Sequence, residues 1–160
     1  AVEYFMKEFI KSGVMSDALT IADRAVKNLR KITRYQGRSP GTTLVAAKID
    51  KKNLYWGSVG DSYIYVVRDK LILVNPLDEE SWGALIQALG GHYDHFDPHF
   101  GNFDLEKGDI VILASDGICD IKESEILTIA KERGNIAHNL VEAVLEAGGR
   151  DNITIIAEEI

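Results

Sequence analysis

Two aspartates flank a glycine turn in residues 114–120, and their type and spacing suit the binding of a cation. Asp116 follows the apolar run 110–114, which predicts a buried strand, so this carboxylate lies where the chain leaves the core. Gly117 permits a sharp turn, and Asp120 points back to the same place if the chain coils after that turn. Mg²⁺ and Mn²⁺ prefer carboxylate oxygens as ligands. The alternative is a solvated turn in which Asp116 caps its own backbone.

Two more aspartates occupy turns in distant parts of the chain. Asp61 follows Gly60 between two apolar segments, and Asp151 follows a glycine pair just before the last apolar segment. Taken alone, Gly60-Asp61 is ordinary tight-turn chemistry. Only a fold that gathers the strand ends brings these two aspartates to Asp116 and Asp120. Two like charges about 4 Å apart repel by about 4 kcal/mol at an effective dielectric of about 20, so such a site requires divalent cations.

The composition excludes several classes of partner. The 160-residue chain has a formal net charge of −7 and no basic block, which argues against nucleic acids and anionic membranes as partners. No apolar stretch approaches the ~20 residues that span a bilayer, and no signal peptide is visible. The single cysteine, Cys119, precludes an internal disulfide and indicates a reducing compartment, so we expect a cytoplasmic location. The length predicts one domain over residues 1–160.

The apolar pattern predicts an α+β domain. We expect strands at residues 42–49, 54–59, 62–68, 71–74, 102–105, 110–114 and 153–157. We expect helices at residues 2–12, 17–35, 79–89, 123–133 and 136–147. Neighbouring strands that are joined by short turns have to pair antiparallel. Helices that are segregated from antiparallel strands indicate a layered domain.

Three histidines and the cysteine suggest two other chemistries. His92, His95 and His99 are spaced for a transition-metal site on a helix, but glycine and proline make this segment a loop. A surface loop with incidental histidines is therefore the favoured interpretation. Cysteine phosphatases carry an arginine six positions after the nucleophile, where this chain has Glu125, whose charge repels phosphate. Cys119 is accordingly interpreted as a small apolar residue beside the acidic turn.

Four motifs follow one another along the chain. They are residues 41–44 (Gly-Thr-Thr-Leu), 59–62 (Val-Gly-Asp-Ser), 108–120, which contain Ser-Asp-Gly, and 151–154 (Asp-Asn-Ile-Thr). In this order the motifs resemble the metal-dependent protein serine/threonine phosphatases of the PPM type, the protein phosphatase 2C family. Residues 88–90 are similar to the family's segment before the Ser-Asp-Gly strand. The resemblance implies an antiparallel β-sandwich of two sheets, with helices on both outer faces.

The resemblance also implies a chemistry. In that family two Mg²⁺ or Mn²⁺ ions activate a bridging water, which attacks the phosphorus of a phosphoserine or phosphothreonine in a protein substrate. Carried over by position, Asp116 and Asp151 match the core metal ligands. Asp61 and Asp120 match acidic residues that, with Asp116, hold a third and weaker metal. Asn152 adjoins a ligand and would orient it.

The chain departs from the family at its beginning. The Asp-Gly-x-Gly-Gly motif, which bridges the two metals, is absent, as are the family's phosphate-binding arginine and general-acid histidine. All of these would precede Ala1, so we expect the catalytic residues upstream and N-terminal strands to be missing from the sheets. Open sheet edges would then favour self-association. Two functions remain as hypotheses: a phosphatase of phosphoproteins, and a non-catalytic phosphatase-like domain that binds a partner or regulates it.

Overall fold

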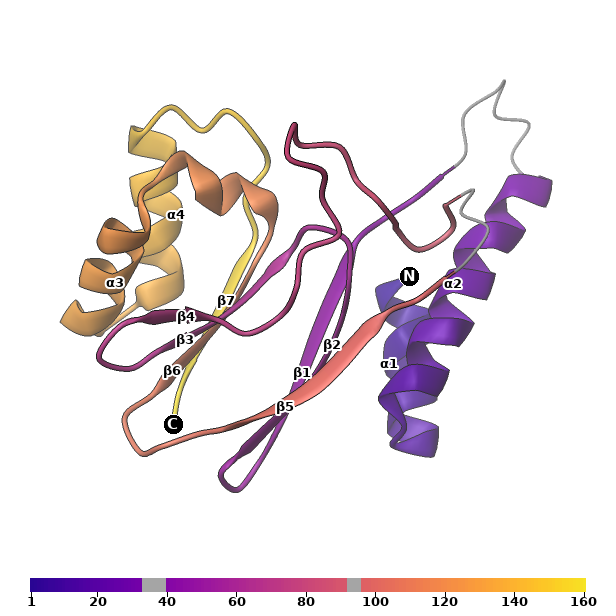
Figure 1. Cartoon of the computed structure of the whole chain (residues 1–160), viewed down its shortest axis with the longest axis horizontal. Helices are drawn as coiled ribbons and strands as arrows, with labels where there is room; N and C mark the ends of the chain where they lie inside the picture. Colours follow the sequence, from indigo (N-terminus) through magenta and orange to yellow (C-terminus); the bar gives the residue numbers. More distant parts are fainter. Residues whose placement is uncertain (33–39, 92–95) are drawn as a thin grey trace.

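Two antiparallel sheets pack face to face, with a pair of helices on each outer side (Figure 1). The computed structural model describes residues 1–32, 40–91 and 96–160. Helices α1 (Val2–Ser12) and α2 (Met15–Ile32) cover one sheet, and helices α3 (Glu123–Glu132) and α4 (Ile136–Glu146) cover the other. The layers therefore run helix, sheet, sheet, helix, which confirms the predicted α+β class and its helix-flanked sandwich.

Helices α1 and α2 form a hairpin because Gly13 ends the first helix. Gly13 has φ +70°, a left-handed conformation that favours glycine, and its N–H donates to the Phe9 carbonyl at 2.8 Å. The buried face of the hairpin consists of Phe5, Ala18, Leu19, Ala22 and Val26. Both helices are present, although α2 begins two residues earlier than expected, and residues 33–35 of the predicted helix lie outside the described residues. No helix in the described part of the chain is both long and apolar enough to cross a bilayer.

The first sheet lies under this hairpin. Its strands are β1 (Leu44–Asp50), β2 (Asn53–Val59) and β5 (His99–Asp104), in that order and all antiparallel. Helix α2 approaches the sheet closely at Gly57, where a Cβ would stand 2.8 Å from the Met15 side chain. A glycine in the strand is therefore what allows the helix and the sheet to pack together at this point.

The second sheet contains the segment singled out by the sequence. Its strands are β4 (Leu71–Leu73), β3 (Tyr63–Val67), β6 (Ile110–Ala114) and β7 (Ile155–Glu159), in the order β4-β3-β6-β7. Helices α3 and α4 cover its outer face. Helix α4 is capped at its N-terminus, because the side chain of Asn135 accepts the His138 N–H at 3.3 Å.

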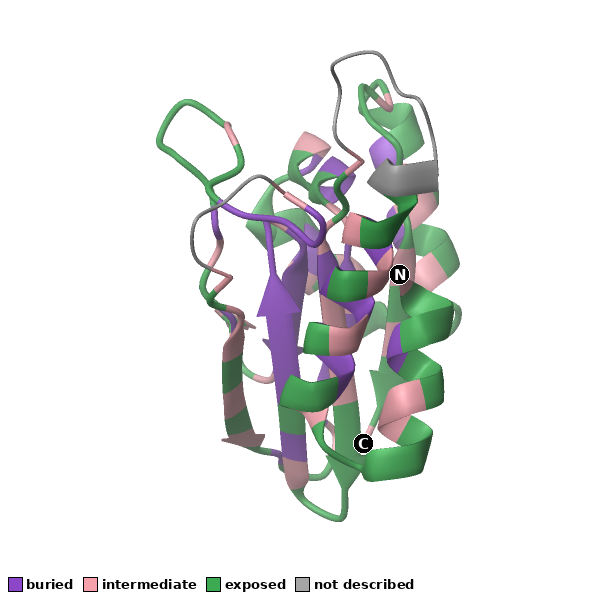
Figure 2. Cartoon of the chain, turned by 90° about the vertical axis from the view of Figure 1, so that its right-hand side faces the viewer, coloured by how far each residue is buried: buried purple, intermediate pink, exposed green. Residues whose placement is uncertain are grey.

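Strand β3 is buried on both faces, and its residues alternate between two cores. Tyr63, Tyr65 and Val67 pack toward helices α3 and α4. Ile64 and Val66 pack toward the first sheet, in the core between the sheets. This alternation follows the two-residue period of a strand. Figure 2 shows the buried residues concentrated in the strands and on the inner faces of the helices.

Residues 79–89 are not a helix, and this prediction was wrong. The segment consists of turns, with an antiparallel bridge from Glu79 to Leu85 and another from Leu89 to Thr42. The apolar spacing imitates one face of a helix, but Leu85 is exposed while Leu89 is fully buried against the α2 cluster. Pairing of Leu89 with the chain before β1 therefore replaces the expected helical hydrogen bonds.

Three strands begin two or more residues away from their predicted starts. Strand β1 begins at Leu44, two residues later than expected. Strand β5 begins at His99, three residues before the expected edge strand 102–105. Strand β7 begins at Ile155, two residues later than expected, because the chain before it contacts the end of β6 instead of pairing as a strand. His99 contacts Asp78, which holds the Gly60 turn, and Thr154, just before β7, contacts Ser115.

A buried ion pair joins the end of β3 to the turn before β6. Arg68 donates to both carboxylate oxygens of Asp109, from Nε at 2.8 Å and from Nη2 at 2.7 Å. The same carboxylate accepts the Glu106 N–H at 2.8 Å, and Asp109 is only 1% exposed. The hydrogen bonds from Arg68 hold the pKa of Asp109 below its ordinary value. This bidentate pair fixes the point at which β6 enters the sheet.

We expect Asp109→Asn to lower the free energy of unfolding by about 2–3 kcal/mol, because it removes the buried negative charge that accepts two hydrogen bonds from Arg68. Arg68 then keeps its exposed partner Glu106 and the Asp104 carbonyl. Since the pKa of Asp109 is lowered in the folded state, its contribution is present above the unfolded pKa and is lost as the pH falls through the folded pKa. Urea unfolding at neutral and acidic pH measures this, and the wild-type advantage should shrink on acidification. Glu159→Gln, which removes the exposed partner of Arg133, is the matched control and should cost less than about 1 kcal/mol. Equal losses in the two variants would contradict the assignment.

Candidate metal centre

The register of the second sheet brings three acidic turns to the same end of its strands. Ala114, the last residue of β6, pairs with Tyr63 at the start of β3 and with Ile155 at the start of β7. The turns that carry Asp61, Asp116 and Asp151 therefore extend beyond the same end of the sheet.

The turn at Gly60-Asp61 is fixed by a carboxylate from a distant loop. Asp78 is buried; its Oδ2 accepts the Gly60 N–H at 2.8 Å, and its own N–H donates to the Gly60 carbonyl at 3.0 Å. The other oxygen of Asp78 contacts His99 Nε2 at 2.7 Å. Gly60 has φ +95°, and a Cβ there would lie 2.3 Å from the Thr43 side chain. Only glycine fits this turn, which sets the position of Asp61 at the start of β3.

The turn after β6 and the loop before β7 are joined by direct contacts. The Ser115 hydroxyl donates to the Asn152 carbonyl at 3.1 Å and accepts the Thr154 N–H at 3.0 Å. The Ser115 N–H donates to the Thr154 carbonyl at 3.0 Å. A Cβ on Gly117 would stand 2.6 Å from the Asn152 carbonyl oxygen, so this close approach requires glycine. These contacts hold Asp116, which follows Ser115, next to the loop that carries Asp151.

Negative charge accumulates where these turns meet. Burial raises the pKa of Asp61, and the charge of Asp116 raises it further. Glu79 and Asp151 add smaller contributions in the same direction. The structure therefore brings Asp61, Asp116 and Asp151 within electrostatic reach of one another, and a bound cation would relieve their repulsion.

Asp120 lies at the far end of the 3₁₀ helix Asp116–Asp120 and has a cationic partner of its own. Its carboxylate accepts the Arg150 backbone N–H at 2.7 Å and the Arg150 Nε–H at 2.9 Å. The chain does coil after Asp116, which is the condition for Asp120 to point back toward it. The Arg150 contacts tie this coil to the loop that carries Asp151, where the Asn152 N–H donates to Asp151 Oδ1 at 2.7 Å. A role for Asp120 as a metal ligand stays a prediction.

The donors suit a hard cation in their chemistry, but they do not form a complete ligand set. Carboxylate oxygens are the ligands that Mg²⁺ and Mn²⁺ prefer. Among residues 1–32, 40–91 and 96–160, however, no three histidine, cysteine, aspartate or glutamate side chains lie close enough to hold a metal ion. The four aspartates therefore supply part of a site, and their assignment as ligands stays a prediction.

The histidines make no site of their own within the part of the chain that the structure describes. His99 opens strand β5 and contacts Asp78, so it lies on a strand and supports the Gly60 turn. His92 and His95 lie outside the described residues.

Cys119 is exposed and shows no sign of an activated nucleophile. Its thiol donates to the Tyr63 hydroxyl at 3.0 Å. Partial burial of the sulfur raises the pKa of the Cys119 thiol, the hydrogen bond with Tyr63 opposes this, and the charges of Glu79 and Asp116 raise the pKa further. A thiol with a raised pKa is a poor nucleophile at neutral pH, which agrees with the interpretation from the sequence.

Sequence reasoning missed two residues that position the acidic turns. Asp78 is buried against Gly60, which is 18 residues earlier, and no local pattern distinguishes it from a solvated aspartate. Ser115 appears in the sequence only as part of the Ser-Asp-Gly motif, but its hydroxyl joins the ends of β6 and β7. The motif was a usable signal for Ser115, because a serine at a strand end often bonds to nearby backbone.

Comparison with known proteins finds relatives of one kind. No protein-family model matches the chain. The chain is 32% identical over 161 aligned residues to protein phosphatase PhpP of Streptococcus pneumoniae. This match covers 86% of the chain but 64% of PhpP, so the chain spans less than two thirds of that relative's length.

Two solved structures are similar to this one. The catalytic domain of the serine/threonine protein phosphatase PstP, in complex with two manganese ions, superposes with a TM-score of 0.78 at 25% identity, over 90% of this chain and 69% of that one. The PPM Ser-Thr phosphatase MsPP of Mycobacterium smegmatis, in complex with cacodylate, superposes with a TM-score of 0.83 at 21% identity, over 99% and 79%. The second likeness shows a shared fold.

Gly117→Ala should push the turn after β6 away from the loop before β7, because the new Cβ meets backbone atoms that cannot move aside. We expect the free energy of unfolding to fall by about 1–3 kcal/mol, as measured by urea titration. Gly41→Ala is the matched control, since the nearest atom to its Cβ would be the Leu89 carbonyl oxygen at an ordinary 3.6 Å. If both variants are equally stable, this contact does not fix the turn.

Proposed function

Because this chain belongs to the PPM family of protein serine/threonine phosphatases, we propose that the protein removes phosphate from phosphoserine or phosphothreonine in other proteins. The observation that carries the proposal is that Asp61, Asp116 and Asp151 lie within electrostatic reach of one another at one end of the second sheet. The repulsion among the three carboxylates favours the binding of a cation, and a bound cation attracts the negative charge of a phosphate.

We propose Mg²⁺ or Mn²⁺ as the cofactor. The similar PstP domain was solved with two manganese ions. In this chain Asp116 and Asp151 would hold the core ions, and Asp61 and Asp120 would contribute to a third. The bound metal would supply an activated water and would neutralise charge on the phosphate. Asn152 would orient Asp151 through its N–H.

The chain's own part in the reaction is to hold these carboxylates in place. Ser115 and Gly117 keep the ends of β6 and β7 in contact, and Asp78 keeps the Gly60 turn closed. Carboxylates fixed on strand ends lose less freedom when a cation binds, which favours tight binding. The bridging ligand and the general acid, expected upstream of Ala1, stay predictions.

A second candidate function is the binding of a phosphorylated partner without turnover. It is favoured by the finding that no three described side chains can hold a metal as they stand. In that case the protein would bind a phosphopeptide but release no phosphate at any metal concentration.

We expect phosphate release from a phosphoserine peptide to require Mn²⁺ or Mg²⁺ and to be lost in Asp116→Asn and Asp151→Asn, because each change removes a charge from the proposed site. The loss should be about 100-fold or more, as seen when a metal ligand or its support is removed. Thermal unfolding with and without Mn²⁺ gives a second readout that needs no turnover. Cys119→Ser is the control and should keep its activity. Activity without metal, or full activity in both aspartate variants, would refute the proposal.

We also propose that residues 1–160 form a single phosphatase domain and that the protein acts in the cytoplasm. The support for the location is the lone, exposed Cys119, which forms no disulfide within the chain and suits a reducing compartment.

Self-association through open sheet edges is a further proposal. Strands β1 and β7 are each paired on one side only within the described residues. Both border a cavity of about 350 Å³ between the sheets, to which Val2 and Ile156 contribute. These two side chains are 67% and 60% exposed. Apolar side chains beside an unpaired strand edge favour pairing with another chain.

Light scattering should therefore give a mass above the 17.7 kDa of one chain. Ile156→Lys should reduce that mass, because it places a charge on the open edge. Trp82→Lys is the control, since Trp82 is 77% exposed but lies on the turn segment after β4. A well-folded wild-type monomer would count against self-association.

A further inference from the structure

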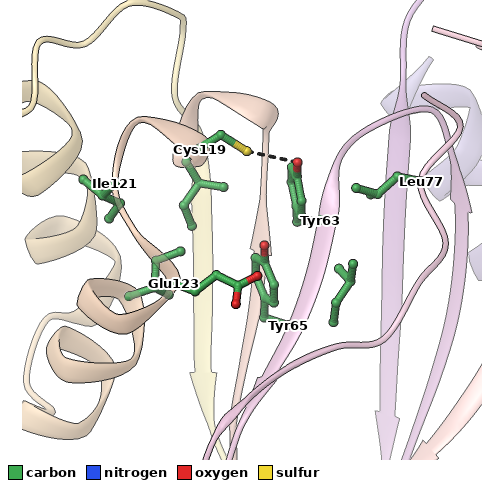
Figure 3. A pocket seen from close by; sticks show the side chains of 9 residues that line it. Tyr63, Tyr65, Leu77, Cys119, Ile121 and Glu123 are labelled. Carbon is green, nitrogen blue, oxygen red and sulfur yellow. Dashed lines mark hydrogen bonds between the residues drawn. The ribbon is translucent and has the colours of Figure 1, made fainter. Parts of the chain in front are cut away.

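A cavity of about 380 Å³ lies beside the 3₁₀ helix Asp116–Asp120, on the outer face of the second sheet (Figure 3). Its apolar wall consists of Leu73, Leu77, Ile118, Ile121 and Ile126. Tyr63, Tyr65, Cys119 and Glu123 also line it and supply its polar atoms. A concave site with an apolar wall and a few convergent polar groups is typical of a binding pocket.

The Tyr65 side chain lines this cavity. The residue as a whole is only 4% exposed, so its position is fixed by packing. Figure 3 shows the hydroxyl directed toward the space between Cys119 and Glu123, where it can contact a ligand atom.

The polar side of the cavity carries negative charge. The Glu123 carboxylate extends beside Tyr65, and its charge contributes to the raised pKa of Tyr65 after the larger effect of burial. No lysine or arginine is among the described residues that line the cavity. Glu123 has no ion-pair partner within residues 1–32, 40–91 and 96–160.

The aromatic side of the cavity also suits a cation. The rings of Tyr63 and Tyr65 are stacked, with centroids 5.4 Å apart and an angle of 12° between their planes. The faces of tyrosine rings attract ammonium and guanidinium groups. An apolar wall, aromatic rings and a carboxylate together match a side chain with an aliphatic stem and a cationic end.

We propose that this cavity binds an arginine or lysine side chain of the phosphorylated substrate, with the cation between Glu123 and Tyr65. The inference rests on the proposed function, because it assigns the substrate's basic residue to a place beside the acidic turns. The connection is direct, since the 3₁₀ helix that begins at Asp116 also supplies Ile118 and Cys119 to the cavity. The Glu123 carboxylate pairs with the cation, and the Tyr65 hydroxyl oxygen accepts a hydrogen bond from it.

The test compares phosphoserine peptides that contain one arginine, moved stepwise along the peptide, with the same peptides containing citrulline. Citrulline keeps the shape of arginine but has no charge. Fluorescence anisotropy in the presence of EDTA measures binding without turnover. We expect the best arginine peptide to bind wild-type protein about five-fold more tightly than its citrulline twin, the size of an exposed ion pair with a cation–π contact.

Glu123→Gln should abolish this preference, and Tyr65→Phe should reduce it. Glu125→Gln is the matched control, because Glu125 lies in the same first turn of α3 and is exposed but does not line the cavity. Equal binding of the arginine and citrulline peptides, or the same loss in the Glu125 variant, would overturn the inference.

Hydrolysis of p-nitrophenyl phosphate with Mn²⁺ tests the proposed function separately, because this substrate has no peptide side chain. An arginine preference without hydrolysis would retain the cavity's role and refute the proposed activity. Hydrolysis without any arginine preference would support the proposed activity and refute the cavity's role.

Discussion

The close approach of Gly117 to the Asn152 carbonyl is the constraint that places the aspartates at the end of the second sheet. Any side chain at position 117 would collide with backbone, so the end of β6 and the loop before β7 meet only because this residue is glycine. Ser115 then uses its hydroxyl as both donor and acceptor to close the contact. Asp116 and Asp151 take their positions from this junction.

The buried aspartates of this protein differ from the aspartates at the end of the second sheet in how their charge is compensated. Asp23, Asp78 and Asp109 are buried, and each accepts a backbone N–H and contacts a basic side chain. Among the described residues neither Asp61 nor Asp116 forms an ion pair, and the charge of Asp116 raises the pKa of Asp61. Paired carboxylates stabilise a fold, whereas unrelieved ones cost stability and are typical of functional sites. This contrast supports placing the chemistry at the edge of the second sheet.

Much of this architecture could be predicted from the sequence because it follows local rules. The strand predicted at residues 62–68 and the helices predicted at 123–133 and 136–147 depend on neighbouring residues, and the structure has them as β3, α3 and α4. Residues 79–89 carried a helical spacing, but the bridge between Leu89 and Thr42 overrode it. Contacts between distant segments leave no local signal.

Prediction of the candidate site from the sequence was limited in the same way. The aspartates could be chosen from their motifs. The sequence could say only that they would lie together if the fold brought the strand ends together. The anchoring of Gly60 by Asp78 and the pairing of Asp120 with Arg150 could not be predicted, because each joins loops far apart in the chain. Residue type alone does not tell a buried, bonded aspartate from a solvated one.

The order β4-β3-β6-β7 has a consequence for the kinetics of folding. Asp61, Asp116 and Asp151 lie on separate segments, and they meet only after β6 has paired with both β3 and β7. Such non-local pairing is slow, because loop closure precedes the contacts that reward it. The repulsion among these aspartates therefore arises late, after the rate-limiting search, and acts mainly by speeding the opening of the finished sheet. A cation at this edge would lengthen the lifetime of the native protein while leaving its rate of formation nearly unchanged.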